Sequence, residues 1–230
     1  MKPILFNDGD VRAILDGRKT QTRRVVTPKH GADVVVTDGQ VWRPSRTDYD
    51  GYASCPYGQT GGRMWVREAW RIGAWQLWSE AVAIDYRADS FCRREWIRIG
   101  DDDGGEAFDK YLKQSIADAK AAGLSADEDG YYHWRAGESP CRWRPSIHMP
   151  RWASRITLEI TDVRVQRLQE ITEYDACAEG FEQGEHLDAP EGCYSFSEGF
   201  RRFWDSIAKP GAHWSDNPWV WAVSFKRVEA

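Results

Sequence analysis

Residues 17–24 read Gly17-Arg18-Lys19-Thr20-Gln21-Thr22-Arg23-Arg24. This basic segment follows a short predicted helix, whose apolar stripe consists of Val11, Ile14 and Leu15. Gly17 stands where a residue with a left-handed backbone usually ends a helix. The segment then enters a predicted strand, so it brings an ammonium group, hydroxyl groups and guanidinium groups close to a helix end. On composition alone, a solvated basic turn is the simplest interpretation of these charges.

The rest of the chain shows the alternation typical of strands, with helical patterns between them. Strands are predicted at Val34–Val36, Val41–Trp42, Met64–Trp70, Ile156–Val165 and Trp219–Phe225. Asp38-Gly39 predicts a hairpin turn between the first two. A change of parity near Thr161-Asp162 predicts a β-bulge. The predicted fold class is therefore α+β and β-rich.

Three further helices are predicted by apolar spacing and capping residues. One has its apolar face from Phe108 to Ala119 and stops near Gly123. Another is marked by Phe200, Phe203, Trp204 and Ile207, and Pro210-Gly211 ends it. A third starts at the N-cap Thr172, with Asp175 in the reciprocal capping position, and ends at Gly180. The whole chain, 1–230, suits a single domain. We interpret 75–140, with its own helix and acidic loop, as an insertion in that domain.

Bulk composition limits the possible functions. The 13 Trp residues suit a packed core, or a surface that stacks flat ligands. A net charge of −5 argues against broad binding of long nucleic acid through phosphates and favours a small ligand. No apolar run has the roughly 18 residues that a membrane span needs, so we expect a cytoplasmic protein with no membrane partner. The five scattered cysteines form no metal-ligand pattern, so no metal site and no cofactor is expected.

Four residues of the basic segment match a family signature. Gly17, Lys19, Thr22 and Arg24 resemble the Gly-x-Lys-x-x-(Glu/Thr)-x-Arg motif of ASCH domains, in the version found in small bacterial amidohydrolases that act on N4-acetylcytidine. Three further stretches resemble the family in the same order along the chain, namely Gly62–Arg67, Arg155–Glu179 and Val220–Lys226. The resemblance implies a PUA-like small β-barrel with capping helices and, here, a helical insertion.

Larger phage and prophage members of the family share other stretches of this chain. The similar stretches are Met64–Glu68, His148–Trp152 and Asn217–Trp221. The resemblance covers about half of the chain and leaves 75–140 unexplained. Because this chain is about twice as long as the small enzymes, the resemblance leaves the substrate open to other modified bases.

The resemblance also implies site residues. It places an amidohydrolase triad on Lys19, Thr22 and Glu179, with Thr22 as nucleophile and the other two in proton transfer, and it leaves open which of the two is the base. Substrate-binding roles fall on Arg24, Arg67 and Glu68, although alternation allows at most one of Arg67 and Glu68 to face a cleft. A structural ion pair is an equal alternative for Arg67.

Glu179 is also notable for its place in the sequence. It ends a predicted helix just before Gly180, where the helix dipole disfavours a carboxylate. We therefore expect either a solvated side chain or a cationic partner, for which Lys19 is the candidate. Because Glu179→Gln removes a negative charge from a helix C-terminus, we expect its melting temperature to hold or rise slightly.

These observations predict hydrolysis of an N-acyl group on a modified cytidine-type nucleoside. The partner is then a modified nucleoside or nucleobase. Two alternatives stay open: a non-enzymatic module that binds single-stranded RNA or modified DNA, and an ASCH-type ribonuclease. The sequence does not indicate an oligomeric state.

Overall fold

The computed structural model describes residues 1–27, 35–37, 40–42, 52–89, 91–99, 106–181 and 195–228. The chain divides into two compact units. The first unit consists of Met1–Pro3, Ala13–Trp65 and Ile156–Ala230, and the second consists of Ile4–Arg12 and Val66–Arg155. The second unit encloses 75–140, the predicted insertion, and extends beyond it on both sides.

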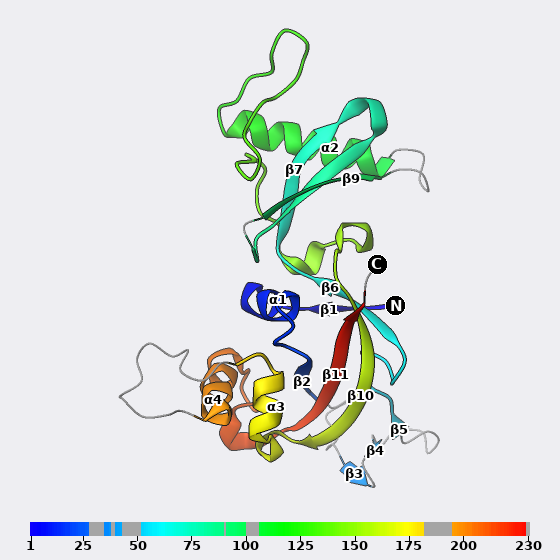
Figure 1. The fold of residues 1–230 in the computed structure, drawn as a ribbon, viewed down its shortest axis with the longest axis vertical. Helices are drawn as coiled ribbons and strands as arrows, with labels where there is room; N and C mark the ends of the chain where they lie inside the picture. The colour runs from blue at the N-terminus through cyan, green and yellow to red at the C-terminus, as the bar shows by residue number, and fades with distance from the viewer. Residues whose placement is uncertain are drawn as a thin grey trace. The chain divides into compact units, whose positions relative to one another are not determined.

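The described secondary structure is mixed and rich in strands (Figure 1). The helices are α1 (Asp8–Leu15), α2 (Glu106–Ala121), α3 (Glu173–Ala178) and α4 (Phe196–Ile207). The strands are β1 (Lys2–Leu5), β2 (Gln21–Val25), β3 (Val35–Thr37), β4 (Gln40–Trp42), β5 (Tyr52–Ala53), β6 (Arg63–Arg67), β7 (Trp70–Gln76), β8 (Ala81–Tyr86), β9 (Phe91–Arg98), β10 (Thr157–Arg167) and β11 (Trp219–Val228). Among the residues described, no helix is long and apolar enough to cross a membrane.

A five-stranded sheet organises the first unit, in the order β1-β6-β10-β11-β2. The long antiparallel pair β10–β11 runs from Thr157↔Val228 to Arg167↔Trp219, and its register shifts between Ile160 and Asp162. This shift confirms the predicted bulge. On the other side of β11, β2 pairs antiparallel from Gln21↔Ser224 to Val25↔Val220.

One face of this sheet carries α3 and α4, which pack together (Figure 1). Their shared core consists of Leu168, Ile171, Ala176, Phe200, Trp204 and Val220. α3 begins as its sequence predicts, because the Thr172 hydroxyl accepts from the Asp175 N–H while the Asp175 carboxylate accepts from the Thr172 N–H. The cap fixes the first turn of a helix of only six residues.

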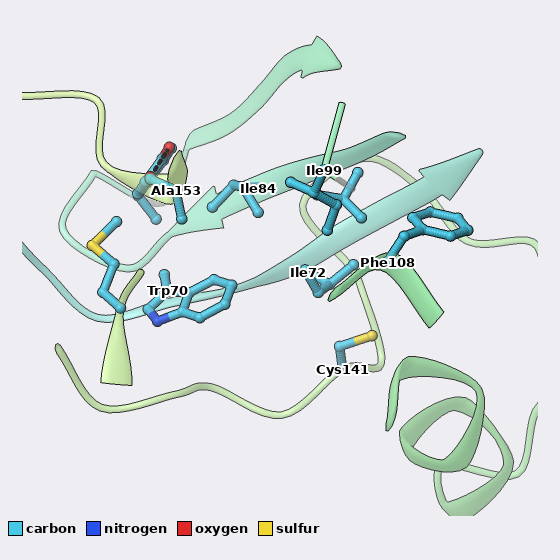
Figure 2. Packing of buried hydrophobic residues seen from close by; sticks show 10 residues of the cluster. Trp70, Ile72, Ile84, Ile99, Phe108, Cys141 and Ala153 are labelled. Carbon is cyan, nitrogen blue, oxygen red and sulfur yellow. Dashed lines mark hydrogen bonds between the residues drawn. The ribbon is translucent and has the colours of Figure 1, made fainter. Parts of the chain in front are cut away.

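A three-stranded antiparallel sheet, β7-β8-β9, and α2 form the body of the second unit. Apolar side chains from the sheet, from α2 and from the segment after it make one core (Figure 2). The buried members are Trp70, Ile72, Val82, Ile84, Tyr86, Ile99, Phe108, Cys141, Met149 and Ala153. α2 ends just before Gly123, whose φ of +83° gives the predicted helix stop.

The edge strand β7 is covered by the segment 134–144. Trp134 Nε1 donates to the Gly73 carbonyl at 2.8 Å, and Ser139 Oγ donates to the Ile72 carbonyl at 2.6 Å. Arg144 exchanges two backbone hydrogen bonds with Trp70, at 2.7 and 3.2 Å. These contacts satisfy backbone groups that an exposed edge would offer to another strand.

The β-rich α+β class agrees with the sequence, but two details differ. The described strands form open sheets, and no closed barrel is present among them, because β1 and β2 lie at opposite ends of the five-strand order. The predicted strand 64–70 is interrupted, since β6 ends at Arg67 and β7 begins at Trp70. The hairpin strands β3 and β4 pair as predicted, while their turn at 38–39 lies outside the described residues.

Candidate functional site

Lys19 and Glu179 meet where β2 approaches the end of α3. The backbone of 19–20 runs alongside both α3 and β11: Thr20 N–H donates to the Ala178 carbonyl, and the Thr20 carbonyl accepts from Phe225 N–H, both at 2.8 Å. Lys19 and Glu179 themselves form an isolated antiparallel bridge. The chain is therefore extended from residue 19 onward, before β2 formally begins.

The side chains of these two residues form a buried ion pair. Lys19 Nζ lies 2.8 Å from Glu179 Oε2 and donates a second hydrogen bond, of 2.7 Å, to the Glu179 carbonyl oxygen. Only 3% of the Lys19 side chain and 4% of the Glu179 side chain are exposed. The contact with the helix-terminal carbonyl also explains why a cation is favourable at this end of α3.

Arg23 is the second cation at Glu179. Its Nη1 lies 3.1 Å from Glu179 Oε1 and donates to Gln21 Oε1 at 2.5 Å. Its Nη2 lies 3.1 Å from Asp175 Oδ2, an ion pair in which Nη2 makes no aligned hydrogen bond. Gln21 Nε2 in turn contacts Ser224 Oγ at 3.1 Å. Two cations thus face two carboxylates in a buried network.

Strand alternation separates Thr22 from this network. Gln21 and Arg23 share one face of β2, as their hydrogen bond shows, so Thr22 and Arg24 lie on the other. Thr22 is buried and pairs with Val223 in a regular ladder. The structure therefore brings Lys19 and Glu179 together and leaves the Thr22 hydroxyl on the opposite face from them.

Gly180 allows Lys19 to lie against the end of α3. Its φ is +93°, a conformation that favours glycine. A Cβ at this position would lie 3.0 Å from both the Ala13 Cβ and the Lys19 Cβ. The sequence marks Gly180 only as a helix stop, whereas the structure gives it a second role as the contact surface for Lys19.

Asp175 connects the network to the helix cap and to the surface. Arg164, about half exposed, contacts Asp175 Oδ1 at 3.0 Å. Burial raises the pKa of Asp175, but the hydrogen bonds from Arg164 and Thr172 and the charge of Arg23 outweigh burial and lower this pKa to about 2. Asp175 therefore stays ionised opposite Arg23.

The lowered pKa of Asp175 predicts a loss of stability in acid. An unfolded Asp has a pKa of about 3.9, so the ionised form stabilises the fold above about pH 4, and this contribution is lost as the pH falls toward about 2. In urea denaturation at a series of pH values, the free energy of unfolding should fall less steeply across this range in Asp175→Asn than in the wild type. Equal slopes would contradict the assignment.

Arg67 and Glu68 belong to the second unit, and each contacts groups of that unit. Arg67 Nη1 donates to the Ile147 carbonyl at 3.2 Å. The buried Glu68 carboxylate receives two hydrogen bonds of 2.9 Å from Arg155, whose third nitrogen binds Asp89 at 2.6 Å. Burial raises the pKa of Glu68, and Arg155 partly opposes this shift. Glu68 thus takes part in a bidentate ion pair typical of a structural contact.

Three members of the network were not predicted from the sequence as site residues: Gln21, Arg23 and Asp175. A signal for the first two exists, because residues 19, 21 and 23 share one face if the chain is extended from Lys19 onward. Asp175 was recognised only as part of the helix cap. Within the described ranges, no three His, Cys, Asp or Glu side chains are grouped as metal ligands.

Comparisons with protein-family models, with curated proteins and with solved structures find no match to this chain.

Proposed function

We propose that this chain is a PUA-like, ASCH-type hydrolase that removes an N-acyl group from a modified cytidine-type nucleoside. One observation carries the proposal: Lys19 Nζ and Glu179 Oε2 lie 2.8 Å apart, although 160 residues separate them. These are two of the three residues that the family resemblance implies. A cation and a carboxylate in contact supply the two functions that amide hydrolysis needs, a proton acceptor and a group that stabilises an oxyanion.

In the proposed reaction Glu179 is the base and Lys19 the cation. The Glu179 carboxylate accepts a proton from the nucleophile, which adds to the acyl carbon, and the Lys19 ammonium stabilises the resulting oxyanion. The C–N bond then breaks. The proton held by Glu179 passes to the departing exocyclic nitrogen, so cytidine and a carboxylic acid are the products.

The position of Thr22 decides which nucleophile we propose. Because Thr22 lies on the opposite face of β2 from Glu179, we assign the attack to a water molecule and not to the Thr22 hydroxyl. Thr22→Ala should then keep turnover within about threefold of the wild type, since a buried hydroxyl on that face takes no part in proton transfer. Loss of all turnover in a folded Thr22→Ala protein would return the role of nucleophile to Thr22.

The experiment that tests the function is the conversion of N4-acetylcytidine to cytidine. The purified protein is incubated with the nucleoside, with and without EDTA, and the products are separated by chromatography. We expect cytidine and acetate in both cases. A panel of other acylated nucleosides extends the test to other acyl groups and to deoxyribose, and no product from any of them would refute the hydrolase.

The burial of the ion pair favours a second candidate function. Four side chains that neutralise one another inside the fold also suit a binding module, in which Lys19 and Glu179 only hold α3 against β2. Such a module would bind single-stranded RNA or a modified nucleobase without turnover. A labelled single-stranded RNA in the same assay separates binding from hydrolysis and from the ribonuclease alternative, since only a ribonuclease shortens the RNA.

A further inference from the structure

Glu179 is held through both of its carboxylate oxygens, each by a different cation. Lys19 contacts Oε2 and Arg23 contacts Oε1, at 2.8 and 3.1 Å. A carboxylate held at only one oxygen keeps the freedom to rotate about its terminal torsion, whereas two contacts on opposite oxygens fix the plane of the group. The direction in which Oε2 faces Lys19 therefore depends on Arg23.

Arg23 is itself fixed from several sides. Its side chain is fully buried, and its guanidinium contacts Gln21, Asp175 and Glu179. The Phe200 ring lies 5.8 Å from its guanidinium carbon, which places α4 on a further side. Gln21 is oriented in turn by Ser224 of β11. Neighbouring residues on β2, α3, α4 and β11 thus determine where this guanidinium lies.

We propose that Arg23 is a positioning residue, which orients the Glu179 carboxylate toward Lys19 and toward the reacting groups. The kinetic part of this inference rests on the proposed hydrolase. A guanidinium suits the task because its planar nitrogens reach two carboxylates and an amide at once, which a single ammonium group does not. Arg24, the arginine that matches the family signature, lies on the opposite face of β2, so the sequence motif does not identify this role.

Arg23→Lys is the informative variant, because it keeps the positive charge and removes the planar guanidinium with its several N–H donors. A matched control is Arg71→Lys in the second unit, where Arg71 Nε binds Asp85 at 2.9 Å and Nη1 binds the Ser139 carbonyl at 2.7 Å. Both variants exchange a largely buried, multiply bonded arginine for lysine. Their melting temperatures should fall by similar amounts.

Turnover should separate the two variants. With N4-acetylcytidine, Arg23→Lys should lower kcat by about ten- to a hundredfold, because a catalytic group displaced by about an ångström reacts that much more slowly. KM should change by less than about twofold, since Arg23 acts only through Glu179 in the proposed reaction. Arg71→Lys should keep kcat and KM. Equal kcat in both variants would overturn the positioning role.

A spectroscopic measurement tests the inference without turnover. The buried Lys19 ammonium, bound to two oxygens of Glu179, should give a 15N–1H signal protected from exchange with water, assigned by its loss in Lys19→Met. Arg23→Lys should broaden or shift this signal, and Arg71→Lys should not. If the wild type shows no turnover, only the proposed hydrolase is refuted. An unchanged Lys19 signal in Arg23→Lys would refute the positioning role.

Discussion

Glu179→Gln should lower turnover of N4-acetylcytidine by about two to four orders of magnitude and the free energy of unfolding by about 3–5 kcal/mol. The first effect follows from the proposed role of Glu179 as the proton acceptor. The second follows from the network, because Lys19 and Arg23 would both remain buried beside a neutral amide. Measuring kcat and urea denaturation on the same preparation tests both effects.

The stability part of this prediction reverses the expectation from the sequence. A negative charge at a helix C-terminus costs typically 0.3–1 kcal/mol, which predicted a neutral or slightly stabilising substitution. Breaking a buried ion pair costs several times more, because it leaves an uncompensated charge inside the protein. The ion pair is the larger effect, so a melting temperature equal to that of the wild type would show that Glu179 is more solvated than the structure places it.

The double variant Lys19→Met/Glu179→Gln should recover most of the lost stability and none of the lost turnover. Removing one cation and one carboxylate together leaves Arg23 opposite Asp175, so the buried charges balance again. Replacing a buried ion pair with uncharged groups of similar size is often neutral or stabilising. Lys19→Met alone, which keeps Glu179 against Arg23, should be destabilised by a few kcal/mol.

The comparison of the single and double variants gives a coupling energy. The predicted losses of the two single variants, with the recovery in the double variant, imply a coupling energy above the about 0.5–3 kcal/mol that is usual for residues in contact. Free energies of unfolding from urea titration of the four proteins provide the cycle. Simple additivity of the two substitutions would mean that Lys19 and Glu179 do not interact in solution.

The sequence predicted those elements whose signals are local. The capping box of Thr172 and Asp175 sits at the start of α3, and Gly17, with a φ of +76°, follows α1 as a left-handed stop. The parity change after Ile160 gave the bulge in β10. Each of these features depends on residues a few positions apart, so the chain itself contains the information.

Which residues form the candidate site depends on a non-local feature, the register in which β2 pairs with β11. A motif names Lys19, Thr22 and Arg24 by their spacing, but the pairing with β11 decides which of them share a face. The pairing places the odd-numbered residues of this segment toward α3, so that Arg23 and not Thr22 joins Lys19 at Glu179. A spacing of three in an extended chain always divides two residues between opposite faces.

The second unit was difficult to predict for a related reason. The first strand of its three-stranded sheet, β7, changes parity at Gly73, between Ile72 and Ala74. A Cβ at Gly73 would collide with the Asp85 carboxylate. The interrupted alternation hides the strand from a search for a regular period of two. The same holds for β8, which is buried on both faces and therefore shows no alternation at all.

The segment 134–144 has a consequence for the solubility of the protein. An uncovered β7 would present a row of unpaired backbone groups flanked by large aromatic side chains, which is a template for self-association. Trp134, Ser139 and Arg144 form hydrogen bonds with those backbone groups. The length of this irregular segment must therefore match the length of the strand that it covers. A nick or a deletion here would uncover this edge, and a deletion would also remove Cys141 from the core, so the altered protein should aggregate as its concentration rises.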